Sequence, residues 1–318
     1  MPEPSPMPRR RGRLLRFGAA VVALLAVAGY LAVQYLTGSA APKCQVVSAQ
    51  DDEAAYEFTP EQAANAATIS AVGTTRGMSE RAVTIALATA LQESGLRNIE
   101  HGDRDSLGLF QQRPSQGWGT SKQIMDPTYA AGVFYEHLAK VPGYAQLPLT
   151  VAAQRVQRSG FPEAYAKHEP DAELLAAALT GHAAATLTCQ GRPAPTAAGG
   201  PDAVRAALVR DFGRDVLQTA GAEVGKGRST SSPMAALTPA ADAVTVPVPQ
   251  KSSASGTVRE RGWELAHWAV ANSSALHIAR VSYAGREWSL GGFADEWRTT
   301  GASDAKASAT EVRIVTGE

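Results

Sequence analysis

The sequence predicts three consecutive parts: an N-terminal transmembrane helix, a mainly α-helical domain and a small α+β domain. An uncharged apolar stretch at residues 17–38 indicates the first part. Helical patterns between the two cysteines of the chain, Cys44 and Cys189, indicate the second, and short strand-like runs near the C-terminus indicate the third. A length of 318 residues leaves room for two modest domains and their connecting segments.

The apolar stretch reads FGAAVVALLAVAGYLAVQYLTG, and 22 residues span roughly 33 Å as a helix, enough to cross a hydrocarbon core. Before it, residues 1–16 hold five arginines and one glutamate, so this basic tail carries a charge of +4. The positive-inside rule then predicts a cytoplasmic N-terminus, a single pass through the cell membrane and an extracytoplasmic bulk. A cleaved signal peptide is the competing interpretation, since GSAA at residues 38–41 supplies small residues. The length of the stretch favours an uncleaved anchor, with the lipid bilayer as a partner.

The two cysteines lie outside the membrane in this topology, and an oxidising compartment favours a disulfide between Cys44 and Cys189. Closing a loop of this length stabilises a fold by on the order of 5 kcal/mol in the chain-entropy picture. Two unrelated buried thiols are the alternative. Residues 39–318 carry 25 basic and 29 acidic side chains, and this net charge of −4 argues against nucleic acid as a partner.

Helix signals fill residues 44–189. TPEQ at residues 59–62 is typical of a capping box at a helix start, and Ser79 is a cap for a second helix. That second helix is apolar, carries Glu93 in its last turn and ends at Gly95, a typical C-terminal glycine. Strand-like alternation is nearly absent, which predicts a mainly α domain. Further helices are expected at residues 122–141, 149–158 and 161–179.

The rest of the chain changes in composition. Residues 190–201 form a predicted linker, and residues 202–318 a small α+β domain with a low-complexity insert at 222–257. Within this domain we expect helices at 202–217 and 262–276, and strands at 244–248, 278–283, 285–289 and 311–316.

The second helix and the segment that follows it suit glycoside chemistry. A general acid must stay protonated near neutral pH, and an apolar helix that ends at Glu93 favours the neutral carboxyl. GLFQQ at residues 108–112 combines a glycine, which permits close backbone approach, with two amide side chains that can bind a sugar. Glu93 is therefore the predicted catalytic residue.

The motifs LQESGL at residues 91–96 and DSLGLFQQ at residues 105–112 resemble the lysozyme-like superfamily of soluble lytic transglycosylases and goose-type lysozymes. The stretch around them is also similar to an actinobacterial subfamily of membrane-anchored, lysozyme-like cell-envelope proteins, and the resemblance covers about residues 60–179. It implies that Glu93 protonates the oxygen between N-acetylmuramic acid and N-acetylglucosamine, and that Ser94 supports it. It also implies a substrate cleft formed by Gly108, Phe110 and Gln111.

Two features depart from the family pattern. The family has a later Ala-Tyr-Asn-Ala-Gly segment whose tyrosine leans toward the glutamate, whereas AAQRVQRS at residues 152–159 contains no tyrosine. Gln157 is the candidate for its role. Hydrolases use a second carboxylate, for which Asp103 is a candidate that positions water, while Asp105 is expected to cap the turn at Ser106. A lytic transglycosylase needs one carboxylate, so both reactions stay open.

Residues 262–297 resemble the distal half of a zinc D-Ala-D-Ala carboxypeptidase-type domain, but the last strand, TEVRI at residues 310–314, lacks the histidines that such enzymes use. This unit is expected to be non-catalytic, and no metal or cofactor is predicted. The sequence therefore predicts a membrane-anchored extracytoplasmic enzyme that cleaves the glycan strands of peptidoglycan. The alternative is a non-catalytic peptidoglycan-binding protein that retains the lysozyme fold. Protein partners are not predicted.

Overall fold

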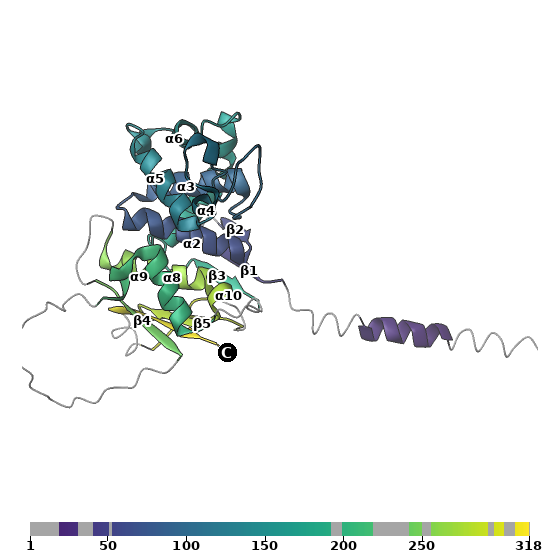
Figure 1. The fold of residues 1–318 in the computed structure, drawn as a ribbon. Helices are drawn as coiled ribbons and strands as arrows, with labels where there is room; N and C mark the ends of the chain where they lie inside the picture. Colours follow the sequence, from purple (N-terminus) through teal and green to yellow (C-terminus); the bar gives the residue numbers. More distant parts are fainter. Residues whose placement is uncertain are drawn as a thin grey trace, which may run out of the picture. The chain divides into compact units, whose positions relative to one another are not determined.

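The computed structural model describes residues 19–30, 41–50, 53–191, 199–218, 242–249, 256–291, 296–301 and 309–317. The chain divides into two units, Met1–Ala41 and Pro42–Glu318 (Figure 1). The predicted basic tail at residues 1–16 lies outside the described residues, as do most of the predicted linker and of the low-complexity insert.

The first unit corrects the prediction of a transmembrane helix over residues 17–38. Its described helix covers residues 19–30. Across the described parts of the chain, no helix has both the length and the apolarity that a membrane crossing requires. The expected partnership with a lipid bilayer rested on this helix. The remaining residues of the predicted span lie outside the described part.

The second unit contains two antiparallel sheets and a set of helices, so its fold is mixed α/β. The first sheet has the strand order β2-β1-β3, built from β1 (Lys43–Val47), β2 (Ala55–Phe58) and β3 (Leu187–Gln190). It corrects the expectation of a mainly α domain over residues 44–189. The three strands have four or five residues each, which is too short for a clear alternation of apolar and polar positions.

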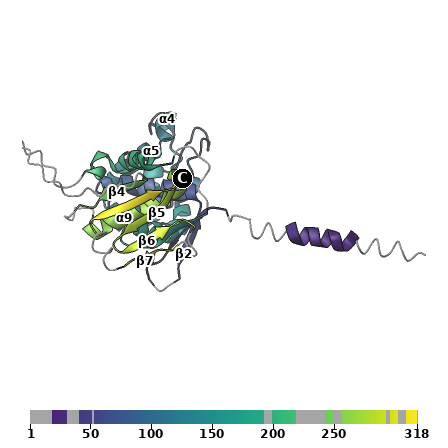
Figure 2. The ribbon, with the colours of Figure 1, turned by 90° about the horizontal axis from the view of Figure 1, so that it is seen from below.

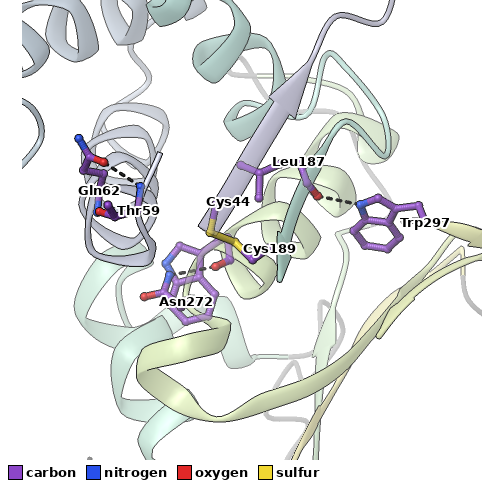
Figure 3. The surroundings of a disulfide bond; sticks show 8 residues. Cys44, Thr59, Gln62, Leu187, Cys189, Asn272 and Trp297 are labelled. Carbon is purple, nitrogen blue, oxygen red and sulfur yellow. Dashed lines mark hydrogen bonds between the residues drawn. A yellow bond between two sulfur atoms is a disulfide. The ribbon is translucent and has the colours of Figure 1, made fainter. Parts of the chain in front are cut away.

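The disulfide between Cys44 and Cys189 is confirmed. The register of β1 against β3 places the two cysteines directly opposite each other, with their Cα atoms 4.0 Å apart. Figure 3 shows the bond beside Asn272 of the C-terminal half, and it shows Trp297, whose Nε1 donates to Leu187 O at 2.9 Å. The bond therefore lies where the two halves of the second unit meet.

The predicted helix starts are confirmed. Thr59 and Gln62 form the capping box of the first helix, and Ser79 caps the next one, which ends at Gly95 with a left-handed φ of 62°. The helix predicted for residues 122–141 is broken, because the Asp126 side chain caps a new helix just before a proline. The elements of this half are α2 (Pro60–Thr75), α3 (Glu80–Ser94), η1 (Pro114–Gln116), α4 (Ser121–Ile124), α5 (Pro127–Ala139), η2 (Tyr144–Gln146), α6 (Leu149–Gln157), η3 (Pro162–His168) and α7 (Glu169–Leu179).

The second sheet occupies the C-terminal half, in the strand order β4-β8-β5-β6-β7 (Figure 2). The strands predicted at 278–283 and 311–316 are present with those bounds. The predicted helix at 202–217 is divided at Gly213. The elements are α8 (Pro201–Phe212), η4 (Arg214–Leu217), β4 (Ala243–Pro247), α9 (Val258–Ala271), α10 (Ser273–Leu276), β5 (Ile278–Tyr283), β6 (Arg286–Ser289), β7 (Arg298–Thr299) and β8 (Glu311–Thr316).

Helix α2 is shared by both halves. It packs against α3 and α5 on one side and against α8 and α9 on the other, while α9 also contacts β5 and β8. Its small side chains allow this close packing on several faces, and its interior positions are almost all buried. Close approach also explains Gly181, whose φ is 82° and where a Cβ atom would collide with the carbonyl of Glu260 in α9. The division at residues 190–201 into two domains stays a prediction.

Candidate active site

Glu93 lies half-buried in the last turn of α3, as the sequence predicted. Its carboxylate accepts a hydrogen bond from the hydroxyl of Tyr165, with 2.7 Å between Tyr165 Oη and Glu93 Oε1. Burial raises the pKa of Tyr165 well above its usual range, and the nearby charge of Glu93 raises it further. The phenol therefore keeps its proton and acts as a donor that fixes one carboxylate oxygen.

Ser94 joins the end of α3 to the Gly-Leu-Phe-Gln segment. Its Oγ lies 2.8 Å from Leu109 O and 3.1 Å from Ala90 O, so the hydroxyl hydrogen bonds across to the segment while staying close to its own helix. Because Ser94 is buried, this bond is shielded from water. The two halves of the predicted motif are thus brought together by a direct contact.

The Gly-Leu-Phe-Gln segment is a tight turn closed by two backbone bonds of 3.0 Å between Leu107 and Gln112. Gly108 has a φ of 74°, and a Cβ atom there would lie 2.7 Å from Ile124 O, so only glycine fits. The close backbone approach predicted at Gly108 is therefore made to the protein itself. Gln111 is half-buried and its Nε2 donates to Gly108 O at 3.2 Å.

Two further predicted residues support this turn from behind. Phe110 is fully buried and stacks on Phe134 with 4.7 Å between the ring centroids. Gln157, the last residue of α6, donates from Nε2 to Phe110 O at 2.8 Å. Both residues therefore hold the turn in position behind Glu93.

Tyr165 contacts the predicted catalytic residue Glu93 but was not among the residues expected from the sequence. It lies in η3, a 3-10 helix, and its ring is fully buried. The family pattern directed attention to residues 152–159, where no tyrosine occurs. The available signal was the pair Ala164-Tyr165, which repeats the first two letters of the family segment a few residues later.

The two candidate second carboxylates lie in the loop between the motif halves. The side chain of Asp103 is 93% exposed and lies 3.9 Å from Arg104. Asp105 accepts from Arg113 Nε at 2.7 Å and from the backbone N–H of Ser115 at 2.8 Å, instead of capping the turn at Ser106. These bonds, led by the one from the Ser115 backbone, hold the pKa of Asp105 well below its usual range. Asp105 is therefore ionised near neutral pH and stabilises its loop through Arg113 and Ser115.

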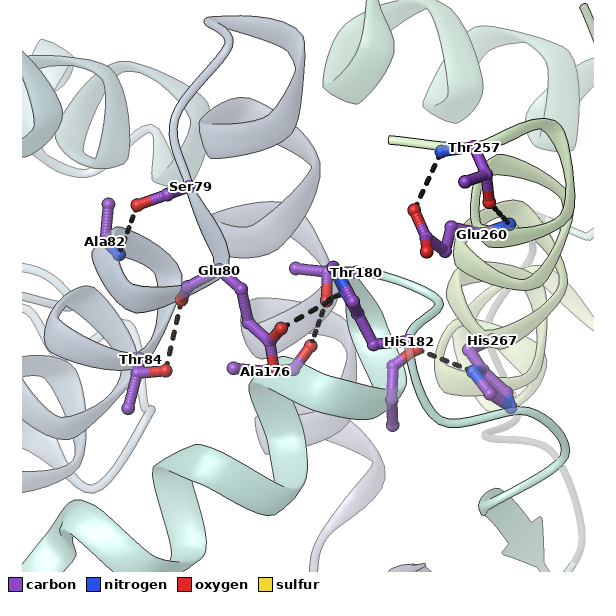
Figure 4. Close-up of polar contacts among 11 residues, drawn as sticks. Ser79, Glu80, Ala82, Thr84, Ala176, Thr180, His182, Thr257, Glu260 and His267 are labelled. Carbon is purple, nitrogen blue, oxygen red and sulfur yellow. Dashed lines mark hydrogen bonds and ion pairs between the residues drawn. The ribbon is translucent and has the colours of Figure 1, made fainter. Parts of the chain in front are cut away.

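A cavity of about 650 Å³ lies at the opposite end of α3 from Glu93, between α7 and the loop that joins β1 to β2. The 13 residues that separate Glu80 at this cavity from Glu93 correspond to about 20 Å along the helix. Charged groups at the cavity are paired with each other. Glu80 lies 3.2 Å from His182 (Figure 4), and Arg81 lies 2.7 Å from Glu169.

The chain matches no family model and no curated protein. The site itself consists of one half-buried carboxyl, one buried phenol that donates a hydrogen bond to it, and a turn that Ser94 fixes against the end of α3. A carboxyl in this setting can give a proton to a bound oxygen atom and take it back.

Proposed function

We propose that the protein is an extracytoplasmic enzyme that cleaves the glycan strands of peptidoglycan, with Glu93 as its general acid. The observation that carries this proposal is the hydrogen bond from Tyr165 to Glu93, because it reproduces the tyrosine–glutamate contact of the lytic transglycosylases that the motifs resemble. The bond from Ser94 to Leu109 supports it, since it places the Gly-Leu-Phe-Gln turn beside the same helix end.

The reaction needs Glu93 to give up one proton and then to take up another. Glu93 donates its proton to the glycosidic oxygen, the bond from that oxygen to the anomeric carbon breaks, and the electron pair stays on the oxygen. The oxygen of the incoming nucleophile then forms a bond to the anomeric carbon and gives its proton to the resulting carboxylate. In a transglycosylase this nucleophile is the 6-hydroxyl of the same sugar, and in a hydrolase it is water. Tyr165 orients the carboxyl throughout because its bond leaves the second carboxyl oxygen to face the substrate.

The disulfide supports an oxidising environment outside the cytoplasm, because such bonds persist there and are rare in reducing compartments. Peptidoglycan lies in that environment. The compartment and the proposed substrate therefore agree.

Burial of Gly108 and Phe110 favours a second candidate, a peptidoglycan-binding protein without turnover. Gly108 and Phe110 were expected to line the cleft, but they pack in the protein interior. In this alternative the fold around Glu93 is retained for binding glycan alone.

The test uses the full chain and purified cell-wall sacculi. We expect the wild-type protein to release soluble muropeptides and Glu93→Gln to lower the rate about a thousandfold, because a general acid contributes on this scale. Glu100→Gln, an exposed glutamate in the following loop, is the matched control and retains activity. Mass analysis separates the reactions, since a 1,6-anhydro end lacks one water relative to a reducing end.

The same samples decide between the two candidates. Folded wild-type protein that binds sacculi but releases nothing favours the binding protein. Folded protein that neither binds nor cleaves sacculi contradicts both.

A further inference from the structure

Phe161 is an aromatic side chain that the fold leaves in solvent. Its exposed fraction is 77%, and among the described residues of the second unit the only other large hydrophobic side chain that is exposed is Val47, at 40%. Exposing a phenyl ring forgoes the free energy of burying it, and a solitary exposed apolar residue is common on protein surfaces. The position of Phe161 relative to Glu93 sets it apart from that common case.

The loop that carries Phe161 lies close to the candidate acid. The backbone N–H of Phe161 donates to Ser159 Oγ at 3.2 Å, and the Ser159 side chain lies near the hydroxyl of Tyr165. Tyr165 in turn donates to Glu93 at 2.7 Å. Ser159 and Tyr165 thus connect the Phe161 backbone to the Glu93 carboxylate, and this path places the Phe161 N–H roughly 10 Å from that carboxylate.

The loop is also anchored from the other side. Gln154 Nε2, in α6, donates to Ser159 O at 2.8 Å, and Phe161 O accepts from the N–H of Ala164 at the start of η3. All of these bonds use backbone atoms or the side chains of Ser159 and Gln154. The ring of Phe161 takes part in none of them, so the loop is anchored without the ring and leaves it exposed to solvent.

A sugar in a glycan strand matches this arrangement. A side chain whose backbone lies roughly 10 Å from the acid can reach a sugar within a few units of the bond that is cut. The face of a pyranose carries C–H groups, and these pack on the electron-rich face of an aromatic ring. We propose that Phe161 is the stacking platform of a saccharide subsite beside Glu93. This inference rests on the proposed function and names the part of the strand that the site grips.

The test measures glycan binding in a chain that cannot cut. Glu93→Gln is the parent, and the probes are the N-acetylglucosamine tetramer and soluble uncross-linked glycan strands, titrated by calorimetry. We expect Phe161→Ala to weaken binding about tenfold and Phe161→Trp to retain it, because a larger aromatic face still stacks. Val47→Ala, the other exposed apolar residue, is the matched control and binds as the parent does.

Phe161 is exposed, so its variants are expected to keep the melting temperature of the parent, and a loss of binding is then a loss of contact. In the active chain, Phe161→Ala raises KM with little change in kcat, as expected for uniform binding. Parent protein that binds neither probe, or Phe161→Ala that binds like the parent, overturns the subsite. If Phe161→Ala loses binding while the wild-type chain never cuts sacculi, the subsite stands and the enzymatic proposal falls.

Discussion

Two regions of the second unit hold carboxylates in opposite ways. At the end of α3, Glu93 is half-buried and accepts one hydrogen bond, from a neutral phenol. Where α2 meets α8 and α9, Asp211 is fully buried and accepts from Trp268 Nε1 at 2.8 Å, from Thr68, and from both ends of the Arg210 fork. The carboxylate of Glu93 thus accepts one side-chain hydrogen bond, whereas that of Asp211 accepts four.

Glu264 repeats the second arrangement. It is buried in α9, accepts from Thr74 of α2 and pairs with Arg261 at 2.7 Å. Within the described residues, no cation forms an ion pair with Glu93. Asp211 and Glu264 each pair with an arginine, whereas Glu93 accepts its hydrogen bond from a neutral phenol. The two regions therefore differ in the charge of the groups that contact their carboxylates.

The largest expected effect on stability comes from the junction. Asp211→Ala leaves the Trp268 and Thr68 donors without a partner, so the free energy of unfolding should fall by about 3 kcal/mol. Glu93→Gln should change it by less than about 1 kcal/mol. Urea unfolding of both variants measures the contrast.

Asp202→Ala is the control, because this aspartate is fully exposed in the same helix and pairs with Arg205 at the surface. It should cost less than about 1 kcal/mol. Equal losses for Asp211→Ala and Glu93→Gln would erase the distinction between the two regions.

The next effect concerns pH. His267 of α9 (Figure 4) is fully buried; its Nδ1–H donates to Ala178 O at 2.7 Å, and its Nε2 accepts from the N–H of Thr186. Burial lowers the pKa of His267 to about 4. Between about pH 6.5 and 4 the unfolded chain binds a proton that the folded chain excludes, so stability falls as pH falls through this window, by up to about 3 kcal/mol.

Urea unfolding at pH 7 and at pH 4.5 measures this dependence. His267→Gln lowers stability at both values but should show a smaller drop between them, because the titrating group is gone. An identical drop in the variant would assign the pH dependence to other groups.

The smallest effect on stability is expected at the candidate active site. Tyr165→Phe removes one hydroxyl and should cost about 1 kcal/mol, while the rate of glycan cleavage should fall about tenfold because the carboxyl is no longer oriented. Tyr135→Phe is matched to it, since Tyr135 is also buried and donates one hydrogen bond, to Ile69 O at 3.0 Å. A similar loss of activity in both variants would show that the Tyr165 hydroxyl has no special role.

Local signals in the sequence were the ones that could be read correctly. The capping residues Thr59 and Ser79, and Gly95 at the end of α3, form hydrogen bonds with residues only a few positions away in the sequence. The segment of Glu93 and Ser94 and the Gly-Leu-Phe-Gln segment are also close in the sequence, and Ser94 joins them. The disulfide was also predictable, because the chain has only two cysteines.

Long-range features escaped the sequence. β1 and β3 lie about 140 residues apart, and neither strand is long enough to show a pattern by itself. Tyr165 reaches Glu93 from a 3-10 helix 72 positions away, and no local pattern encodes that contact. The partners of Asp211 come from three helices, so its burial depends on the whole fold.

The disulfide joins the first strand of the second unit to a strand that follows 145 residues later. A chain made from its N-terminus therefore holds Cys44 as an unpaired thiol until Cys189 has also emerged. Since the sequence has two cysteines, oxidation within one chain has a single product and leaves an isomerase nothing to reshuffle. The competing product is a disulfide between two copies of the chain. The yield of the intrachain bond therefore depends on the concentration of chains that have not yet folded.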